Sequence, residues 1–228
     1  MKMKKKKNPY QAHLFNFKRF IYDVSRWFGW PLFLWFRVKK QYVNKKQKHH
    51  IKGGAMVISN HILYSDPMVL HCTFWDRRLD FVITDEITRT NKFKKWLFTH
   101  WGCIPVDRDH FSLTYFREIV QRLEGGNLIA IFPEGHVSFA NENPMSPFKS
   151  GAVLMAYQAN VPIIPVYREI RENIWKRQRV LIGEPVDIKK QFGDKIGMKE
   201  VDEISKYLFE KENELKEIYH ELNKGRKK

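Results

Sequence analysis

The chain has 228 residues, of which 43% are hydrophobic and 29% charged, and this composition excludes a disordered or fibrous protein. The length suits one domain with a small appendage. The formal net charge of +16 is uneven, because residues 1–52 hold 15 basic residues and a single acidic one, Asp23, so that they carry +14. We therefore expect an acidic partner to be met mainly by the N-terminal quarter.

Residues 1–9 form a basic tail, and residues 10–37 form a segment rich in aromatic and basic residues. An apolar stripe predicts an amphipathic helix over residues 14–28, and a second short helix is expected over 31–37. The longest uncharged run that is rich in aromatic residues, residues 27–36, is about half the roughly 20 residues that a membrane-spanning helix needs.

This segment is expected to bind an anionic membrane on its cytoplasmic face, as a peripheral or monotopic anchor. Nucleic acid is not the expected partner, because its binding sites usually space aromatic residues over a sheet or groove. The alternative is a helix that packs on the protein's own core. The side chains expected to enter the membrane are Phe17, Ile21, Trp27, Phe28, Trp30 and Trp35.

Strands and helices alternate through the remaining domain, residues 38–228. A basic stretch over 38–50 suits a strand, and further strands are expected at 55–59, 80–84, 103–106, 127–132, 161–167 and 179–182. Helices are expected at 66–75, 91–100, 112–123, 148–158 and 198–222. The alternation predicts an α/β fold with a largely parallel or mixed sheet flanked by helices. Cys72 and Cys103 indicate neither a disulfide framework nor a metal cluster.

Ligands of such sheets bind beyond the carboxyl ends of the strands, so the residues that follow each strand are the candidates. His61 follows the first apolar strand, and Asp66 lies five residues later, close enough for its carboxylate to orient one ring nitrogen of the histidine. The other nitrogen could act as a base on a bound hydroxyl. Taken singly, His61 could equally be a packing residue and Asp66 a helix cap.

Four further candidates follow later strands. Glu134 and Gly135 come after the strand at 127–132, while Arg108 and Lys149 could hold an anionic group. Each of these charged residues, taken alone, could also be a solvated surface residue.

Together, five short blocks resemble the glycerolipid acyltransferases, the superfamily of the lysophosphatidic acid (1-acylglycerol-3-phosphate) acyltransferases. The blocks occur in the family's order, and they are His61 with Asp66 (H-x4-D), 102–108 (G-x-I-x-V-x-R), 132–135 (F-P-E-G), 148–152 (F-K-x-G-A) and 161–166 (V-P-I-x-P-V).

The resemblance implies an acyltransferase that makes phosphatidic acid from lysophosphatidic acid in phospholipid biosynthesis. His61 would be the general base and Asp66 its orienting partner. Glu134 and Gly135 would help to bind the lysophospholipid acceptor, and Arg108 and Lys149 its phosphate. The acyl donor would be acyl-CoA or acyl carrier protein, with no bound cofactor, no metal and no acyl-enzyme.

Two positions depart from the family pattern. Val137 stands where the family often has an arginine that binds phosphate, and Leu63 stands where it often has serine. The first departure leaves open an acyltransferase with another acceptor, such as a lyso-aminolipid. A second alternative is a non-catalytic module that binds lipid or nucleic acid.

Overall fold

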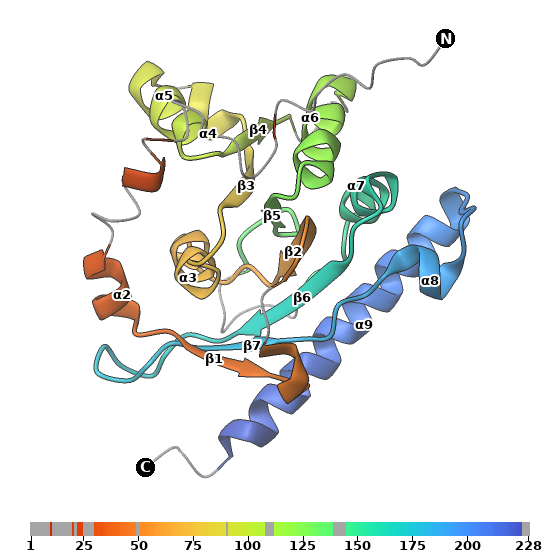
Figure 1. Ribbon diagram of the computed structural model, residues 1–228. Helices are drawn as coiled ribbons and strands as arrows, with labels where there is room; N and C mark the ends of the chain where they lie inside the picture. Colours follow the sequence, from red (N-terminus) through yellow and green to blue (C-terminus); the bar gives the residue numbers. More distant parts are fainter. Residues whose placement is uncertain are drawn as a thin grey trace.

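The computed structural model describes residues 10, 20, 22–24, 30–48, 51–89, 91–107, 112–138 and 145–224, and there a seven-stranded sheet lies between two layers of helices (Figure 1). The strands are β1 (Lys39–Tyr42), β2 (Ala55–Ser59), β3 (Leu79–Thr84), β4 (Ile104–Val106), β5 (Leu128–Ile131), β6 (Ile163–Arg168) and β7 (Arg179–Ile182). The helices are α2 (Trp30–Phe36), α3 (Asp66–Thr73), α4 (Glu86–Arg89), α5 (Lys92–His100), α6 (Leu113–Glu124), α7 (Gly151–Ala159), α8 (Ile188–Phe192) and α9 (Met198–Asn223), with a 3-10 helix, η1, at Lys45–Lys48. The predicted mixed α/β fold is confirmed.

The sheet has the strand order β1-β7-β6-β2-β5-β3-β4. Strands β6, β2, β5, β3 and β4 are parallel, whereas β7 runs antiparallel to β6 and parallel to β1. The five parallel strands therefore end at one edge of the sheet, which we call the carboxyl edge, and the loops that follow them meet there.

Strand β2 lies at the centre and is buried on both faces. Met56 and Ile58 pack against α6, α7 and α9, while Ala55 and Val57 pack against α3 on the opposite face. A continuous apolar strand is the pattern expected where helices cover both faces of a parallel sheet.

The glycine that opens the second sequence block has a structural role. Gly102 has a φ of +82°, and a Cβ there would come within 2.3 Å of the Asp80 carboxylate. That carboxylate is buried and accepts a hydrogen bond of 2.8 Å from Arg122. Only glycine therefore fits between the α5–β4 turn and this ion pair.

The predicted elements differ from the observed ones mainly at short segments. Helices α4 and α8 are missing from the prediction because four or five residues are too few to show a periodic pattern. The basic stretch at 38–50 forms a strand only over β1. The helix expected from 148 begins at Gly151, because the backbone N–H of Lys149 donates instead to the Pro133 carbonyl.

The described part of the N-terminal helix packs on the domain. Residues 20 and 22–24 are helical, and the buried Tyr22 hydroxyl accepts a hydrogen bond from the Leu79 backbone N–H at 3.1 Å. Asp23 pairs with Arg78 at 2.5 Å. In the described ranges no helix is long and apolar enough to cross a membrane. Trp35 is 55% exposed, and the predicted membrane-facing side chains of Phe17, Ile21, Trp27, Phe28 and Trp30 lie outside what the structure describes.

Candidate active site

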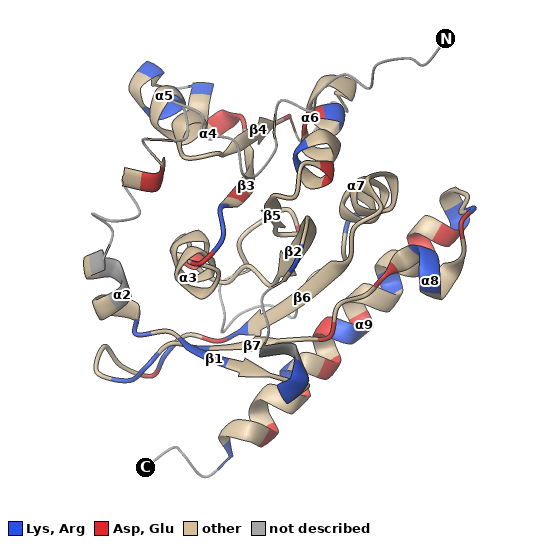
Figure 2. Cartoon of the chain, in the orientation of Figure 1, with Lys and Arg blue, Asp and Glu red and all other residues tan. Residues whose placement is uncertain are grey.

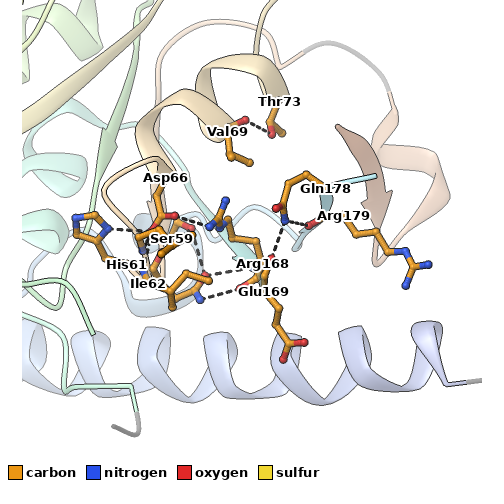
Figure 3. A network of polar contacts seen from close by, with 12 residues as sticks. Ser59, His61, Ile62, Asp66, Val69, Thr73, Arg168, Glu169, Gln178 and Arg179 are labelled. Carbon is orange, nitrogen blue, oxygen red and sulfur yellow. Dashed lines mark hydrogen bonds and ion pairs between the residues drawn. The ribbon is translucent and has the colours of Figure 1, made fainter. Parts of the chain in front are cut away.

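His61 and Asp66 meet at the carboxyl edge, as the sequence predicts. His61 Nδ1 donates to Asp66 Oδ2 at 2.9 Å (Figure 3). The imidazole stacks on Phe132 with the ring centroids 4.0 Å apart. The bond fixes the tautomer and leaves Nε2 as the ring nitrogen that can act as a base. The histidine side chain is 16% exposed, so this nitrogen can be reached by a ligand.

The Asp66 carboxylate is fully buried and is held from both sides. Oδ2 also accepts hydrogen bonds from the backbone N–H groups of Ile62 at 2.7 Å and Leu63 at 2.9 Å. Since Leu63 contributes through its backbone, a serine is not needed for this contact. The helix cap is Ser65 rather than Asp66, so the carboxylate serves the histidine and its loop.

Arg168, the last residue of β6, supplies the charge that balances this carboxylate. Its guanidinium lies 2.6 Å from Asp66 Oδ1, on the side opposite His61, and the arginine is 1% exposed (Figure 3). Burial lowers the pKa of Arg168 and the Asp66 charge opposes that change. The His61–Asp66 pair, which we call the dyad, thus extends to Arg168, and both Asp66 and Arg168 are buried. The sequence signal was an arginine that ends an otherwise apolar strand.

Asn60 fixes the start of the loop at residues 60–65, which carries His61 and which we call the His61 loop. Its side-chain amide donates to the Arg168 carbonyl at 2.9 Å, and its side-chain oxygen accepts from the Arg168 N–H at 3.2 Å. The backbone N–H of Asn60 donates to Glu212 Oε1 at 3.3 Å. The side chains of Asn60 and Glu212 therefore tie the residue before His61 to β6 and to α9.

Glu212 is fully buried, and burial raises its pKa well above the ordinary range of a glutamate. The prediction from sequence gave it no role. Its signal is its position on the apolar stripe of α9, four residues after Leu208 and three before Leu215.

Glu134 is buried, and its carboxylate joins three loop segments. Oε1 accepts from the His61 backbone N–H at 3.0 Å, while Oε2 accepts from the Ser138 hydroxyl at 2.8 Å and the Ser146 N–H at 3.0 Å. These contacts position the His61 loop. Binding of an acceptor by Glu134 stays a prediction.

Gly135 and Lys149 lie together at the same edge. Gly135 has a φ of +76°, and a Cβ at this position would come within 3.0 Å of the Lys149 side chain. The two residues line the same cavity as His61, and Lys149 is exposed. Arg108, the other predicted phosphate ligand, lies outside the described residues.

A cavity of about 370 Å³ opens beside the dyad. His61, Gly135 and Lys149 line it together with many apolar side chains, among them Phe81, Ile83, Phe116, Ile131, Leu154 and Met155. The size falls within the range of small-molecule sites. One base and one ammonium group beside an apolar cavity suit a ligand that has a polar head and a long hydrocarbon chain.

The sequence model of the Acyltransferase family matches residues 37–169 of this chain, which include the dyad, Glu134, Lys149 and Arg168. The chain belongs to this family. The resemblance of the five blocks is thereby confirmed at the level of the family. Helix α9, which carries Glu212, lies beyond the matched residues.

Individual relatives share part of the sequence. A probable 1-acyl-sn-glycerol-3-phosphate acyltransferase of Mycoplasma genitalium is 34% identical over 126 residues, which are 50% of this chain and 44% of that protein. A 1-acyl-sn-glycerol-3-phosphate acyltransferase of Haemophilus influenzae is 28% identical over 181 residues, 72% of this chain and 70% of that protein. The match thus spans less than half the length of the Mycoplasma relative.

The fold also resembles a solved structure. The crystal structure of the 1-acyl-sn-glycerophosphate (LPA) acyltransferase PlsC from Thermotoga maritima aligns with a TM-score of 0.58 and 21% identity, covering 89% of this chain and 81% of that one. This likeness shows a shared fold.

Proposed function

We propose that this acyltransferase moves a fatty acyl group from an acyl thioester to the free hydroxyl of lysophosphatidic acid, giving phosphatidic acid for phospholipid biosynthesis. The observation that carries the proposal is the His61–Asp66 pair at the mouth of an apolar cavity with Lys149. The names of the Mycoplasma and Haemophilus relatives, both 1-acyl-sn-glycerol-3-phosphate acyltransferases, support the same acceptor.

The reaction needs a base and no enzyme nucleophile. His61 Nε2 takes the proton of the acceptor hydroxyl, and the oxygen attacks the thioester carbonyl carbon. The tetrahedral intermediate then collapses, the C–S bond breaks, and the imidazolium returns the proton to the departing thiolate. Asp66 stabilises the imidazolium by charge and by its hydrogen bond, and Arg168 balances the carboxylate.

The donor is acyl-CoA or acyl carrier protein, and it acts as a co-substrate. The acceptor headgroup depends on the cations of the cavity. In the described part of the chain, Lys149 is the one lysine or arginine that lines the cavity, and Val137 supplies no charge. This observation favours one second candidate, an acyltransferase of the same family whose lysolipid acceptor has a different headgroup, such as a lyso-aminolipid.

The substrates are lipids, so we also propose that the protein acts at the cytoplasmic face of a membrane as a peripheral or monotopic protein. The +14 charge of residues 1–52 and the exposed Trp35 support contact with an anionic surface.

The test is an acyl-transfer assay with the full chain, lysophosphatidic acid in mixed micelles, and either acyl-CoA or acyl carrier protein. Monoacylglycerol and a lyso-aminolipid serve as alternative acceptors, and His61→Ala is the control for background transfer. Transfer to lysophosphatidic acid that needs His61 supports the proposal. Equal use of the phosphate-free acceptor would replace it with the second candidate.

A further inference from the structure

Two groups of exposed apolar side chains lie at the carboxyl edge. The first, the hairpin patch, joins the β6–β7 loop to α2, with Ile174 52% and Trp175 79% exposed beside Leu34 at 61% and Trp35 at 55%. Arg171 connects the two elements, because its guanidinium donates to the Trp35 carbonyl at 2.6 Å and lies over the Trp35 ring. The hairpin patch is therefore one continuous surface.

The second group, the α5 patch, consists of Phe93 and Trp96 on α5, a helix that buries none of its residues. Phe93 is 66% and Trp96 46% exposed, and their rings stack with centroids 5.9 Å apart. Asn91 caps the helix by accepting hydrogen bonds from two backbone N–H groups, so the helix has its own local reason to form. Phe98 of this helix packs against the core, whereas Phe93 and Trp96 contact each other and remain exposed.

The sheet topology places both patches around the active site. The β6–β7 loop follows β6, and α5 follows β3, while β2 and β5, which carry His61 and Glu134, lie between those two strands. In Figure 1, α5, α2 and the β6–β7 loop lie along the left side of the view. A flat surface placed along that side could meet all three elements.

The apolar surface also continues from α5 toward the cavity. Ile87 of α4, a helix that packs against α5, is 43% exposed and lines the cavity, as does Tyr64. An acyl chain that enters along Ile87 would remain in contact with apolar groups before it reaches His61.

The charged residues beside these two patches indicate which kind of partner they bind. Lys92, Lys94 and Lys95 are exposed on α5, which has no acidic residue (Figure 2). On the hairpin loop Arg177 is exposed, and the exposed Glu172 pairs with Lys176. Protein interfaces are depleted of lysine, whereas lysine beside tryptophan and phenylalanine is typical of a surface that contacts anionic lipid.

We infer that the hairpin patch and the α5 patch both insert into the headgroup region of an anionic bilayer, so that the cavity lies between two points of membrane contact. The contact expected of residues 10–37 is then only part of the membrane surface. The inference rests on the proposed function for its purpose, but membrane insertion can be measured without substrate, so the two can fail separately.

The direct test places an environment-sensitive fluorophore on single cysteines in the full chain. The native Cys72 and Cys103 are buried, which restricts labelling to an introduced cysteine. The probe sites are Phe93→Cys and Trp175→Cys, and the control is Met198→Cys, because Met198 is equally exposed, at 66%, at the start of α9. Vesicles contain phosphatidylcholine with one third phosphatidylglycerol.

We expect fluorophore emission to increase on vesicles at the first two sites and to stay unchanged at 198. The double variants Ile174→Ser/Trp175→Ser and Phe93→Ser/Trp96→Ser should each lower vesicle partitioning about tenfold, which equals about 1.4 kcal/mol. Their turnover of a soluble short-chain acceptor should be unaffected. Vesicle-bound protein with unchanged emission at 93 and 175 would overturn the inference, and so would self-association that buries these sites in solution.

Discussion

Replacement of Arg168 by methionine should impair catalysis through Asp66 rather than through the substrate. Methionine keeps much of the volume but removes the cation 2.6 Å from a carboxylate that has no exposed surface. Loss of one partner from a buried ion pair typically costs about 3–5 kcal/mol. Asp66 retains three donors to Oδ2, so we expect a cost near the lower end of that range.

The loss of positive charge also favours protonation of the His–Asp pair. We therefore expect the acidic limb of the pH profile of kcat/KM to move to higher pH. Because Arg168 does not line the cavity, KM for the acceptor should change little while kcat falls. Arg168→Lys keeps a positive charge, so its acidic limb should lie between those of Arg168→Met and the unmodified protein.

The matched control is Arg122→Met. Arg122 forms a buried ion pair of 2.8 Å with Asp80, the second residue of β3, at the edge of the sheet opposite the dyad. This variant should lose stability without any shift of the pH profile. A folded Arg168→Met enzyme with the pH profile of the unmodified protein would refute the role assigned to the arginine.

Three further predictions concern the groups around the dyad. Burial raises the pKa of Glu212, so its folded form holds a proton that the unfolded chain releases, and its contribution to stability falls as pH rises from about 4. In chemical unfolding, Glu212→Gln should have the same free energy of unfolding as the parent near pH 4 and a higher one at pH 8, by about 1.4 kcal/mol for each unit by which the pKa is raised. Equal stability of the two proteins at both pH values would contradict this. Glu134→Gln turns an amide donor toward backbone and hydroxyl donors, so it should cost about 1–3 kcal/mol of unfolding free energy, whereas Ser138→Ala should cost less. Lys149→Ala should raise KM for a phosphate-bearing acceptor and leave that for monoacylglycerol unchanged, and an equal effect on both acceptors would argue against phosphate binding.

The sequence predicts the fold well where single elements carry a strong pattern. The apolar strands β2 and β7 appear with the expected bounds, and His61 and Asp66 meet because a five-residue loop has few ways to place them. Local patterns mark Arg168 and Glu212 as charged residues in apolar elements, but they could not reveal what the two residues contact, because both act from distant strands or helices. Their contacts to Asp66 and Asn60 span more than 100 residues of sequence.

The role of Glu134 shows a second limit. Its block indicates that a carboxylate is needed at the end of β5, but a motif does not tell whether the group faces a ligand or the protein. The structure directs both carboxylate oxygens to neighbouring loop segments. The N-terminal segment is a third case, because its aromatic and basic residues predict an affinity for lipid, whereas Tyr22 and Asp23 attach the described part of the segment to the domain.

His61 is proposed as the general base of an acyl transfer. The most direct measurement compares the initial rate of thiol release from acyl-CoA or acyl carrier protein, in the presence of lysophosphatidic acid, between the full chain and His61→Ala. Circular dichroism confirms that the variant is folded. We expect the rate to fall about 10²–10⁴-fold, the usual contribution of a general base. A folded His61→Ala protein that transfers the acyl group at a near-normal rate would contradict the account.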